Sequence, residues 1–171
     1  MAVTSKSAKV TLPTDDQILI TRTFDAPKHL VYRAWTTPEL VMRWWAGHRG
    51  AMESVEIDLR VGGAWRYVIK ANHGFQVAFH GEFREIVPNE RIVNTEIYEV
   101  PEEQMEMVAG LPETEPPLNI VTFTEVDGHT TLTLLVECHS RELRDVILES
   151  GMEEGMQEQM DVLEELAVSL A

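Results

Sequence analysis

The chain has 171 residues, 44% of them hydrophobic, which is enough to bury one core, so we expect a single domain. Its formal net charge of −15 argues against nucleic acid and anionic membrane surfaces as partners, because binding to either needs clustered Lys and Arg. No run of about 18 apolar residues is present, residues 1–16 are polar and Cys138 is the single cysteine, so the sequence predicts no membrane span, no signal peptide and a reducing, cytoplasmic setting.

The chain divides into a tail and one domain. Residues 1–16 carry Ser, Thr, Lys and Asp together with Pro13, which predicts a flexible N-terminal tail with a short strand near Lys9–Leu12. Residues 17–171 are expected to form the domain, since no composition shift, repeat or low-complexity tract divides them further.

A strand and two short helices are predicted at the start of the domain. The alternating, β-branched segment Gln17–Phe24 is typical of a strand. Asp25-Ala26-Pro27 then supplies an N-cap residue and a proline near the first helical turn. Thr37-Pro38 repeats this signal, so we expect a second short helix that ends near Trp45.

Antiparallel strands fill the middle of the chain, because alternating segments are separated by turn residues there. These segments cover residues 53–58, 64–69, 76–87, 91–100, 119–126 and 130–138. Asp127-Gly128 is a strong two-residue hairpin signal between the last two. Residues 101–118 are acidic, rich in proline and too long for a hairpin turn, and they fit either a lid over a site or a disordered insertion. A short helix is expected over residues 140–149.

A long amphipathic helix is predicted over Ser150–Ala171. Its Leu and Met residues fall on one arc at helical spacing, and most of its carboxylates fall on the other side. Ser150 and Glu153 have the spacing of a capping box, which would start this helix. Gly151 and Gly155 border the apolar arc, where we expect them to allow close approach to the sheet.

This order of elements predicts an α+β fold in which a curved antiparallel sheet of about six to seven strands wraps around a long C-terminal helix. The two short helices would interrupt the sheet after its first strand. A sheet that bends enough around a helix encloses space, so the fold itself can provide an internal cavity.

Several separate motifs agree, in order, with one known family. They are RTFDAP at 22–27, VYRAWT at 31–36, WW at 44–45, VGGAW at 61–65, HGEFREIVP at 80–88 and GMEEGM at 151–156. They resemble the activator-of-Hsp90-ATPase homologue domain, and the resemblance runs from about Ile18 to Leu166. It implies a member of the START-like (SRPBCC, helix-grip) superfamily, whose members often bind an apolar ligand between sheet and helix.

No catalytic or metal centre is predicted. The six histidines show no H-x-x-x-H spacing, and no C-x-x-C pair exists, so a metal site has no support. Val61-Gly62-Gly63 is not followed by a helix start, which makes it a turn rather than a phosphate loop. Cys138 lies near a strand end, where a buried thiol is the simpler interpretation. We therefore expect no catalytic residue, metal or cofactor.

An apolar pocket between the sheet and the C-terminal helix is the better-supported site. Aromatic side chains share strand faces and methionines face them from the helix, and such a soft lining suits variable apolar ligands. The same side chains could also simply fill a core. The candidate lining is Trp45, Trp65, Tyr67, Phe79, Phe83, Glu96, Met152, Met156, Gln159 and Leu163.

Two polar residues of this set would orient a ligand. Gln159 lies at the centre of the apolar arc of the helix. Glu96 shares a strand face with Asn94 and Tyr98, and if this is the inner face, burial raises the pKa of Glu96. If the other face is inward, Glu96 is an ordinary solvated carboxylate; alternation does not decide, and the solvated position is the simpler one. Of Trp44 and Trp45, one would plug the end of the sheet and the other would lie at the pocket mouth.

We expect the domain to bind a small lipophilic molecule, such as a lipid, a polyketide or a flavonoid-like compound, without catalysis. One alternative is a stress-related interaction domain with an Hsp90-type chaperone as partner. The co-chaperone of the family has a further N-terminal domain that contacts Hsp90, so the family name says little about this chain's partner. The second alternative is a cyclase-type enzyme that uses Glu96 as general acid or base.

Overall fold

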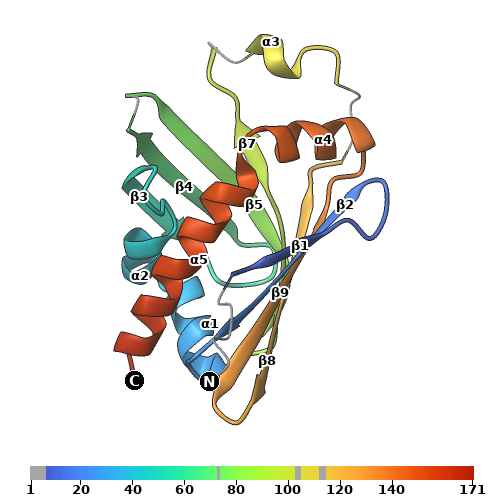
Figure 1. Ribbon diagram of the computed structural model, residues 1–171. Coiled ribbons are helices and arrows are strands. Elements are labelled where there is room, and N and C mark those ends of the chain that lie inside the picture. Colours follow the sequence, from blue (N-terminus) through green and yellow to red (C-terminus); the bar gives the residue numbers. More distant parts are fainter. Residues whose placement is uncertain (1–6, 73, 103–104, 112–114) are drawn as a thin grey trace.

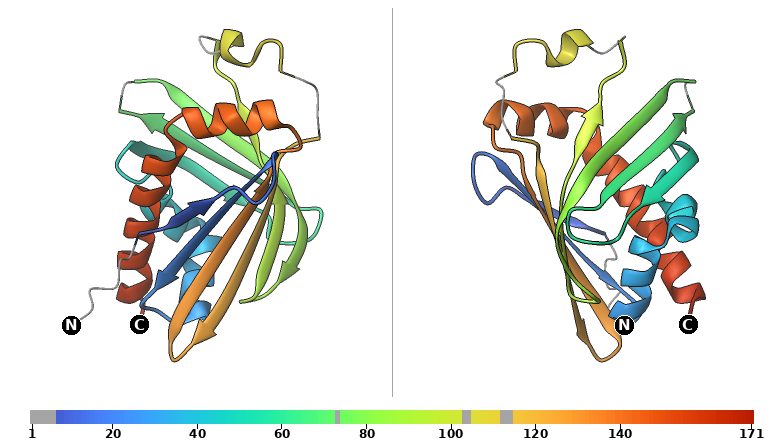
Figure 2. Two further views of the ribbon diagram at one scale, coloured as in Figure 1. Left: turned by 45° about the vertical axis from the view of Figure 1, so that its right-hand side comes forward. Right: turned by 180° about the vertical axis from the view of Figure 1, so that it is seen from behind.

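The computed structural model describes residues 7–72, 74–102, 105–111 and 115–171 (Figure 1). It has the α+β architecture expected from the sequence, the helix-grip fold, with a long C-terminal helix lying across the open side of a curved antiparallel sheet (Figure 1). Figure 2 shows from two further sides that the sheet is curved and that this helix lies against one side of it. Of the helices in these residues, none is sufficiently long and apolar to cross a membrane.

The strands within the described residues form one antiparallel sheet. They are β1 (Lys9–Thr11), β2 (Gln17–Phe24), β3 (Gly50–Ile57), β4 (Ala64–Ala71), β5 (Gln76–Val87), β6 (Arg91–Thr95), β7 (Ile97–Glu99), β8 (Leu118–Val126) and β9 (His129–Glu137). Their order in the sheet is β1-β2-β9-β8-β6-β5-β4-β3, with β7 paired to β5. Part of the expected N-terminal tail is therefore packed, since β1 pairs with β2 and Ala8 is buried. Residues 1–6 of that tail lie outside the described residues.

The strand expected over residues 91–100 is interrupted. β6 and β7 are separated at Glu96, whose backbone N–H donates to the carbonyl of Pro117 at 2.9 Å and so extends the pairing of β6 with β8 by one residue. The register of β5 shifts between Phe83 and Glu85, opposite Val93 and Asn94, and it is then unchanged across Glu96, from the pair Phe83–Asn94 to the pair His80–Ile97. Glu96 lies two positions after Asn94, so strand alternation places both side chains at the inner side of the sheet.

Five helices occur in the described residues. They are α1 (Lys28–Thr36), α2 (Pro38–Trp44), α3 (Met105–Val108), α4 (Arg141–Glu149) and α5 (Met152–Ser169). α3 lies in the long connection over residues 101–118, and Figure 1 shows it beyond α4 at the top of the molecule. A lid role for this connection stays a prediction.

The predicted start of α2 at Thr37-Pro38 is confirmed, whereas those of α5 and α1 need correction. The capping box of Ser150 with Glu153 is wrong, because the hydroxyl of Ser150 donates to the carbonyl of Ile147 at the end of α4. α5 starts after Gly151, which has a φ of +84° and so allows the sharp turn between the two helices. The N-cap of α1 is Pro27 and not Asp25.

The glycines of α5 do not mark close approach to the sheet. A Cβ atom at Gly151 or at Gly155 would meet only the guanidinium of Arg49, in both cases at the ordinary contact distance of 3.9 Å. Arg49 crosses this turn of the helix to pair with two carboxylates, Glu158 at 2.8 Å and Glu154 at 3.3 Å. The prediction of close approach is therefore wrong, and these positions accommodate an arginine.

The apolar arc of α5 packs into the core, but it also carries a charge. Met156, Met160, Leu163, Leu166 and Ala167 are buried. Glu164, which helical spacing places on the polar side, is buried as well and is 8% exposed. Arg22 on the inner face of β2 is the reason, because its guanidinium contacts Glu164 at 3.3 Å and Asp161 at 2.8 Å. The backbone N–H of Asp25 also donates to Glu164.

Candidate functional site

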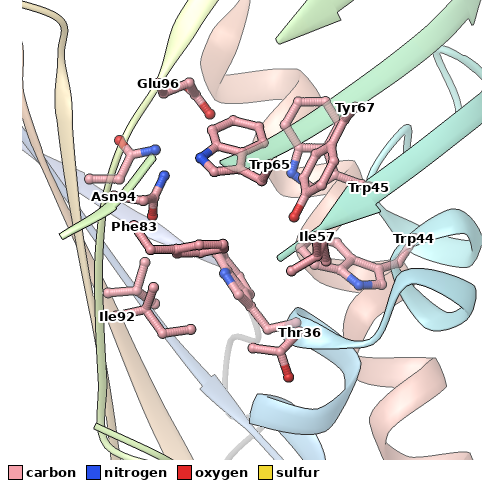
Figure 3. Close-up of a pocket in the computed structure, with 13 residues that line it drawn as sticks. Thr36, Trp44, Trp45, Ile57, Trp65, Tyr67, Phe83, Ile92, Asn94 and Glu96 are labelled. Carbon is pink, nitrogen blue, oxygen red and sulfur yellow. The ribbon is translucent and has the colours of Figure 1, made fainter. Parts of the chain in front are cut away.

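A cavity of about 40 Å³ lies between the inner face of the sheet and the two short helices α1 and α2 (Figure 3). Its lining combines aromatic rings with a few polar groups. The residues are Trp35, Thr36, Trp44, Trp45, Ile57, Trp65, Tyr67, Phe83, Ile92, Asn94, Glu96, Asn119 and Val121. All four tryptophans of the chain are among them.

The aromatic rings form walls that stand at angles to one another. Trp45 and Tyr67 meet edge to face, with ring centroids 5.1 Å apart and an interplanar angle of 74°. Trp65 lies 4.7 Å from Tyr67 at 55°. Trp44 is fixed by its indole N–H, which donates to the carbonyl of Ala34 at 2.9 Å. The cavity is thus faced by ring surfaces as well as by ring edges.

Gly81 on β5 makes room for the indole of Trp65. The two residues are directly paired between β4 and β5, and the indole N–H donates to the carbonyl of Thr95 at 3.1 Å. A Cβ atom at Gly81 would lie 1.9 Å from that carbonyl oxygen and 2.6 Å from the indole nitrogen. A glycine is needed here for close approach, and it determines where one wall of the pocket stands.

The polar end of the pocket comes from β6, β8 and the residue between β6 and β7. Asn94 and Asn119 are paired residues of β6 and β8, both on the inner face. Glu96 follows two positions after Asn94, and Figure 3 shows its carboxyl pointing toward Trp65. Glu96 as a whole residue is half-buried, while its carboxyl group lies in the pocket lining. The solvated position considered for Glu96 is therefore wrong.

Burial changes the acid–base chemistry of this end. Removal from water raises the pKa of Glu96 to about 7, although a hydrogen bond from Asn119 to the carboxylate acts in the opposite direction. The pKa of the Tyr67 phenol is raised as well, first by burial and then by the negative charge of Glu96. Glu96 therefore exchanges its proton close to neutral pH.

The predicted pocket residues fall into two groups. Those that line the cavity are Trp45, Trp65, Tyr67, Phe83 and Glu96. Phe79 packs beside it, with its ring 5.1 Å from both Trp45 and Tyr98. The α5 residues are not in the lining: Met156 and Leu163 are buried in the core, Met152 is half-buried, and the Gln159 amide donates to the carbonyl of Trp45. Contact of any of these residues with a ligand stays a prediction.

Several lining residues were missing from the candidate set, among them Trp35, Thr36, Ile57, Ile92, Asn119 and Val121. A signal for Asn119 was present in the sequence. Asn119 alternates with Val121 and Phe123 along β8, and an apolar alternation of this kind indicates the inner face. The pairing of Asn119 with Asn94 had no such signal, because strand register across a long connection cannot be read from either segment alone.

The described residues contain no group of three or more His, Cys, Asp or Glu side chains that could hold a metal ion. Cys138 is buried, and burial raises the pKa of its thiol to about 11. A thiol with this pKa is almost entirely protonated at neutral pH, so Cys138 is a poor nucleophile. The chemically distinctive group of the described structure is the Glu96 carboxyl.

Comparison with known families gives one match. The profile described as "Activator of Hsp90 ATPase homolog 1-like protein" matches residues 25–167. A search of the curated proteins gave no match.

Solved structures with the same fold come from several bacteria. A Rhodobacter sphaeroides protein is 20% identical, with 95% of this chain and 99% of that chain covered and a TM-score of 0.82. A Mycobacterium smegmatis protein is 22% identical, covering 96% and 99% with a TM-score of 0.80. A Nitrosomonas europaea protein is 21% identical, with 93% of this chain and 98% of that chain covered and a TM-score of 0.77. At these identities the likeness supports the fold alone.

Proposed function

Because the chain belongs to the Activator of Hsp90 ATPase homolog 1-like protein family, and its helix-grip fold commonly holds ligands, we propose that it binds a small, largely apolar molecule in the tryptophan-lined pocket. The observation that carries this proposal is the pairing of an aromatic cavity with a buried carboxyl group. Apolar walls with a few convergent polar groups and a perturbed pKa are the usual marks of a small-molecule site.

The alternative of a plain core is less consistent with the lining. A core gains nothing from a carboxyl group, because burying an ionisable group without compensation lowers stability. Here burial raises the pKa of Glu96 to about 7, which is the measure of that unfavourable placement. A group kept in such a position is more easily understood as part of a site.

The size of the cavity limits how a ligand enters. A cavity of about 40 Å³ is well below the roughly 150 Å³ of an apolar cavity that accepts benzene, so a larger ligand must displace a side chain. Trp45 is the natural candidate because it is half-buried and follows the last residue of α2. Its carbonyl is held by Gln159 of α5, so movement of Trp45 would be coupled to the long helix.

A second function is favoured by one observation. A carboxyl group with a pKa of about 7 can give or take a proton at neutral pH, which suits a general acid or base of a cyclase-type enzyme. An interaction with an Hsp90-type chaperone is supported by the family name, whereas the pocket is supported by this chain's own residues. The pocket is therefore the basis of the proposal.

The test is a two-dimensional NMR titration of the labelled protein with a panel of fatty acids, flavonoids and small aromatic compounds. We expect shifts concentrated at the indole N–H groups of Trp45 and Trp65. Val121→Met fills part of the cavity and should weaken binding about tenfold or more, since overpacking opposes ligand entry. Val93→Met is the matched control, because Val93 is also buried in a strand but lies outside the lining. Unchanged spectra at the pocket with every compound would contradict the proposal.

A further inference from the structure

The polar atoms of the pocket differ in whether the protein supplies them with a hydrogen-bond partner. Three of its donors are used internally: Trp65 Nε1 and Asn94 Nδ2 both donate to the carbonyl of Thr95 at 3.1 Å, and Trp44 Nε1 donates to a backbone carbonyl at 2.9 Å. Asn119 presents the opposite case. Its Oδ1 is a buried acceptor for which the described part of the chain supplies no hydrogen-bond donor, and the residue is 9% exposed.

The described pocket lining contains an acidic side chain but no basic one. Among the residues that the structure places in the lining, none is Lys, Arg or His, and Glu96 is the one carboxylic acid. Tyr67 from β4 is the other titratable group that faces Glu96, while α1, α2 and β8 contribute uncharged side chains. Ionised Glu96 therefore has no countercharge in the lining, which is why burial raises its pKa.

Aromatic rings stand around this acceptor pair. The rings of Trp45 and Trp65 are each tilted against the ring of Tyr67, and the faces and edges of these three rings border the cavity. A cation within about 6 Å of such a face is attracted by the ring electrons. The volume of about 40 Å³ exceeds the roughly 10–15 Å³ needed for one water, which is room for an ammonium group and its first carbon.

We propose that the pocket binds the protonated amino group of a small lipophilic amine, with its N–H groups donating to Asn119 Oδ1 and to the Glu96 carboxylate and its charge facing the rings of Trp65 and Tyr67. This inference rests on the proposed function, because it uses the same pocket and names the class of ligand. A carboxylate ligand would meet the charge of Glu96, and an alcohol would satisfy Asn119 but leave that charge uncompensated.

Three probes of nearly equal shape separate these classes: benzylamine, benzyl alcohol and benzoate, titrated at about pH 8 and followed by NMR at the Asn119 side-chain amide and the Trp65 indole. We expect benzylamine to bind about tenfold or more tightly than benzyl alcohol, because its donors meet a charged acceptor. Benzoate should bind weakest of the three. The comparison uses the unaltered protein, so it does not depend on a variant that folds.

Two variants then locate the effect. Glu96→Gln should reduce the affinity for benzylamine about tenfold or more and change that for benzyl alcohol little. Glu39→Gln removes the same charge from the exposed surface of α2 and should leave both affinities unchanged. The affinity of the unaltered protein for benzylamine should also fall between about pH 8 and pH 6, as Glu96 becomes protonated, and this dependence should vanish in Glu96→Gln.

The outcomes separate the two proposals. If benzyl alcohol or benzoate binds as tightly as benzylamine, or if Glu96→Gln leaves benzylamine binding intact, the amine assignment is overturned and the pocket remains a binding site. If none of the three probes shifts a pocket resonance and the apolar panel also fails, the proposed function is overturned together with it.

Discussion

Glu164 and Glu96 are both withdrawn from water, one on α5 and the other between β6 and β7, but their surroundings differ. Glu164 has the guanidinium of Arg22 at 3.3 Å and the backbone N–H of Asp25 at 3.0 Å. Glu96 has the amide of Asn119 and aromatic rings, and no cation lines the cavity around it within the described residues. The first acid is paired with a cation of the protein itself, and the second has no cation among the described residues of the pocket lining.

The two acids belong to regions of different character: Glu164 to a packed contact between β2 and α5, and Glu96 to the lining of the pocket. The contacts of Arg22 with Asp161 and Glu164 connect β2 of the sheet to α5. A buried charge pair of this kind is consistent with a fixed arrangement, because removal of one partner leaves the other uncompensated. Around Glu96 the protein keeps a cavity instead of a countercharge. Substitutions at Arg22, Glu96 and Asn119 test this difference between the two acids.

The largest effect is expected at Arg22. Arg22→Met leaves Glu164 buried without its cation, so the free energy of unfolding should fall by about 3–5 kcal/mol. Urea denaturation at neutral pH measures this loss. The double variant Arg22→Met with Glu164→Leu should recover most of it, since both charges are then absent. A loss below about 1 kcal/mol in the single variant would mean that this pair is not compensating.

Glu96→Gln should act in the opposite direction. The pKa of Glu96 is raised from 4.5 to about 7 in the folded state, so the folded protein holds a proton that the unfolded chain releases, and stability falls as pH rises through this window. The variant, which cannot ionise, should be more stable than the unaltered protein by about 3 kcal/mol near pH 8 and equal to it near pH 4.

Urea denaturation of both proteins across this pH range checks the result. Glu39→Gln serves as the control, because Glu39 is exposed on α2 and its removal should leave the pH dependence unchanged. Parallel stability curves for Glu96→Gln and the unaltered protein would show that Glu96 ionises freely and would remove the contrast with Glu164.

The smallest effect concerns the hydrogen bond between Asn119 and Glu96. This bond lowers the pKa of Glu96 against the influence of burial, so Asn119→Leu should raise that pKa above its present value of about 7. Asn94→Leu is the matched control, because the Asn94 amide donates to the carbonyl of Thr95 and not to Glu96. Carbon-13 NMR titration of the labelled carboxyl group reports both values. Equal pKa values in the two variants would contradict the assigned role of Asn119.

Most elements of this fold were predictable because they depend on local patterns. β2 and β5 have the predicted bounds, since alternation and turn residues act over a few positions. The predicted start of α5 was wrong. Ser150 has the spacing of a cap for α5, but its hydroxyl bonds to the last turn of α4. Local spacing does not show which of two adjacent helices a residue serves.

The polar part of the site was less predictable for a different reason. Alternation places Glu96 on the same face as Asn94, but which face of this strand is inward depends on its pairing with β8, which is distant in sequence. The burial of Glu164 depends likewise on Arg22, from the other end of the chain. Whether a carboxylate can be buried depends on partners that are distant in sequence. Helical or strand periodicity gives no information about those partners.

The distribution of the tryptophans has a practical consequence. All four of them line one cavity, so the tryptophan fluorescence of this protein comes entirely from its pocket. Emission excited at the indole band therefore reports the state of that cavity with no background from the rest of the chain. Ionisation of Glu96, displacement of Trp45 and arrival of a ligand each change the surroundings of these rings. The protein thus contains its own optical probe in the lining of the pocket.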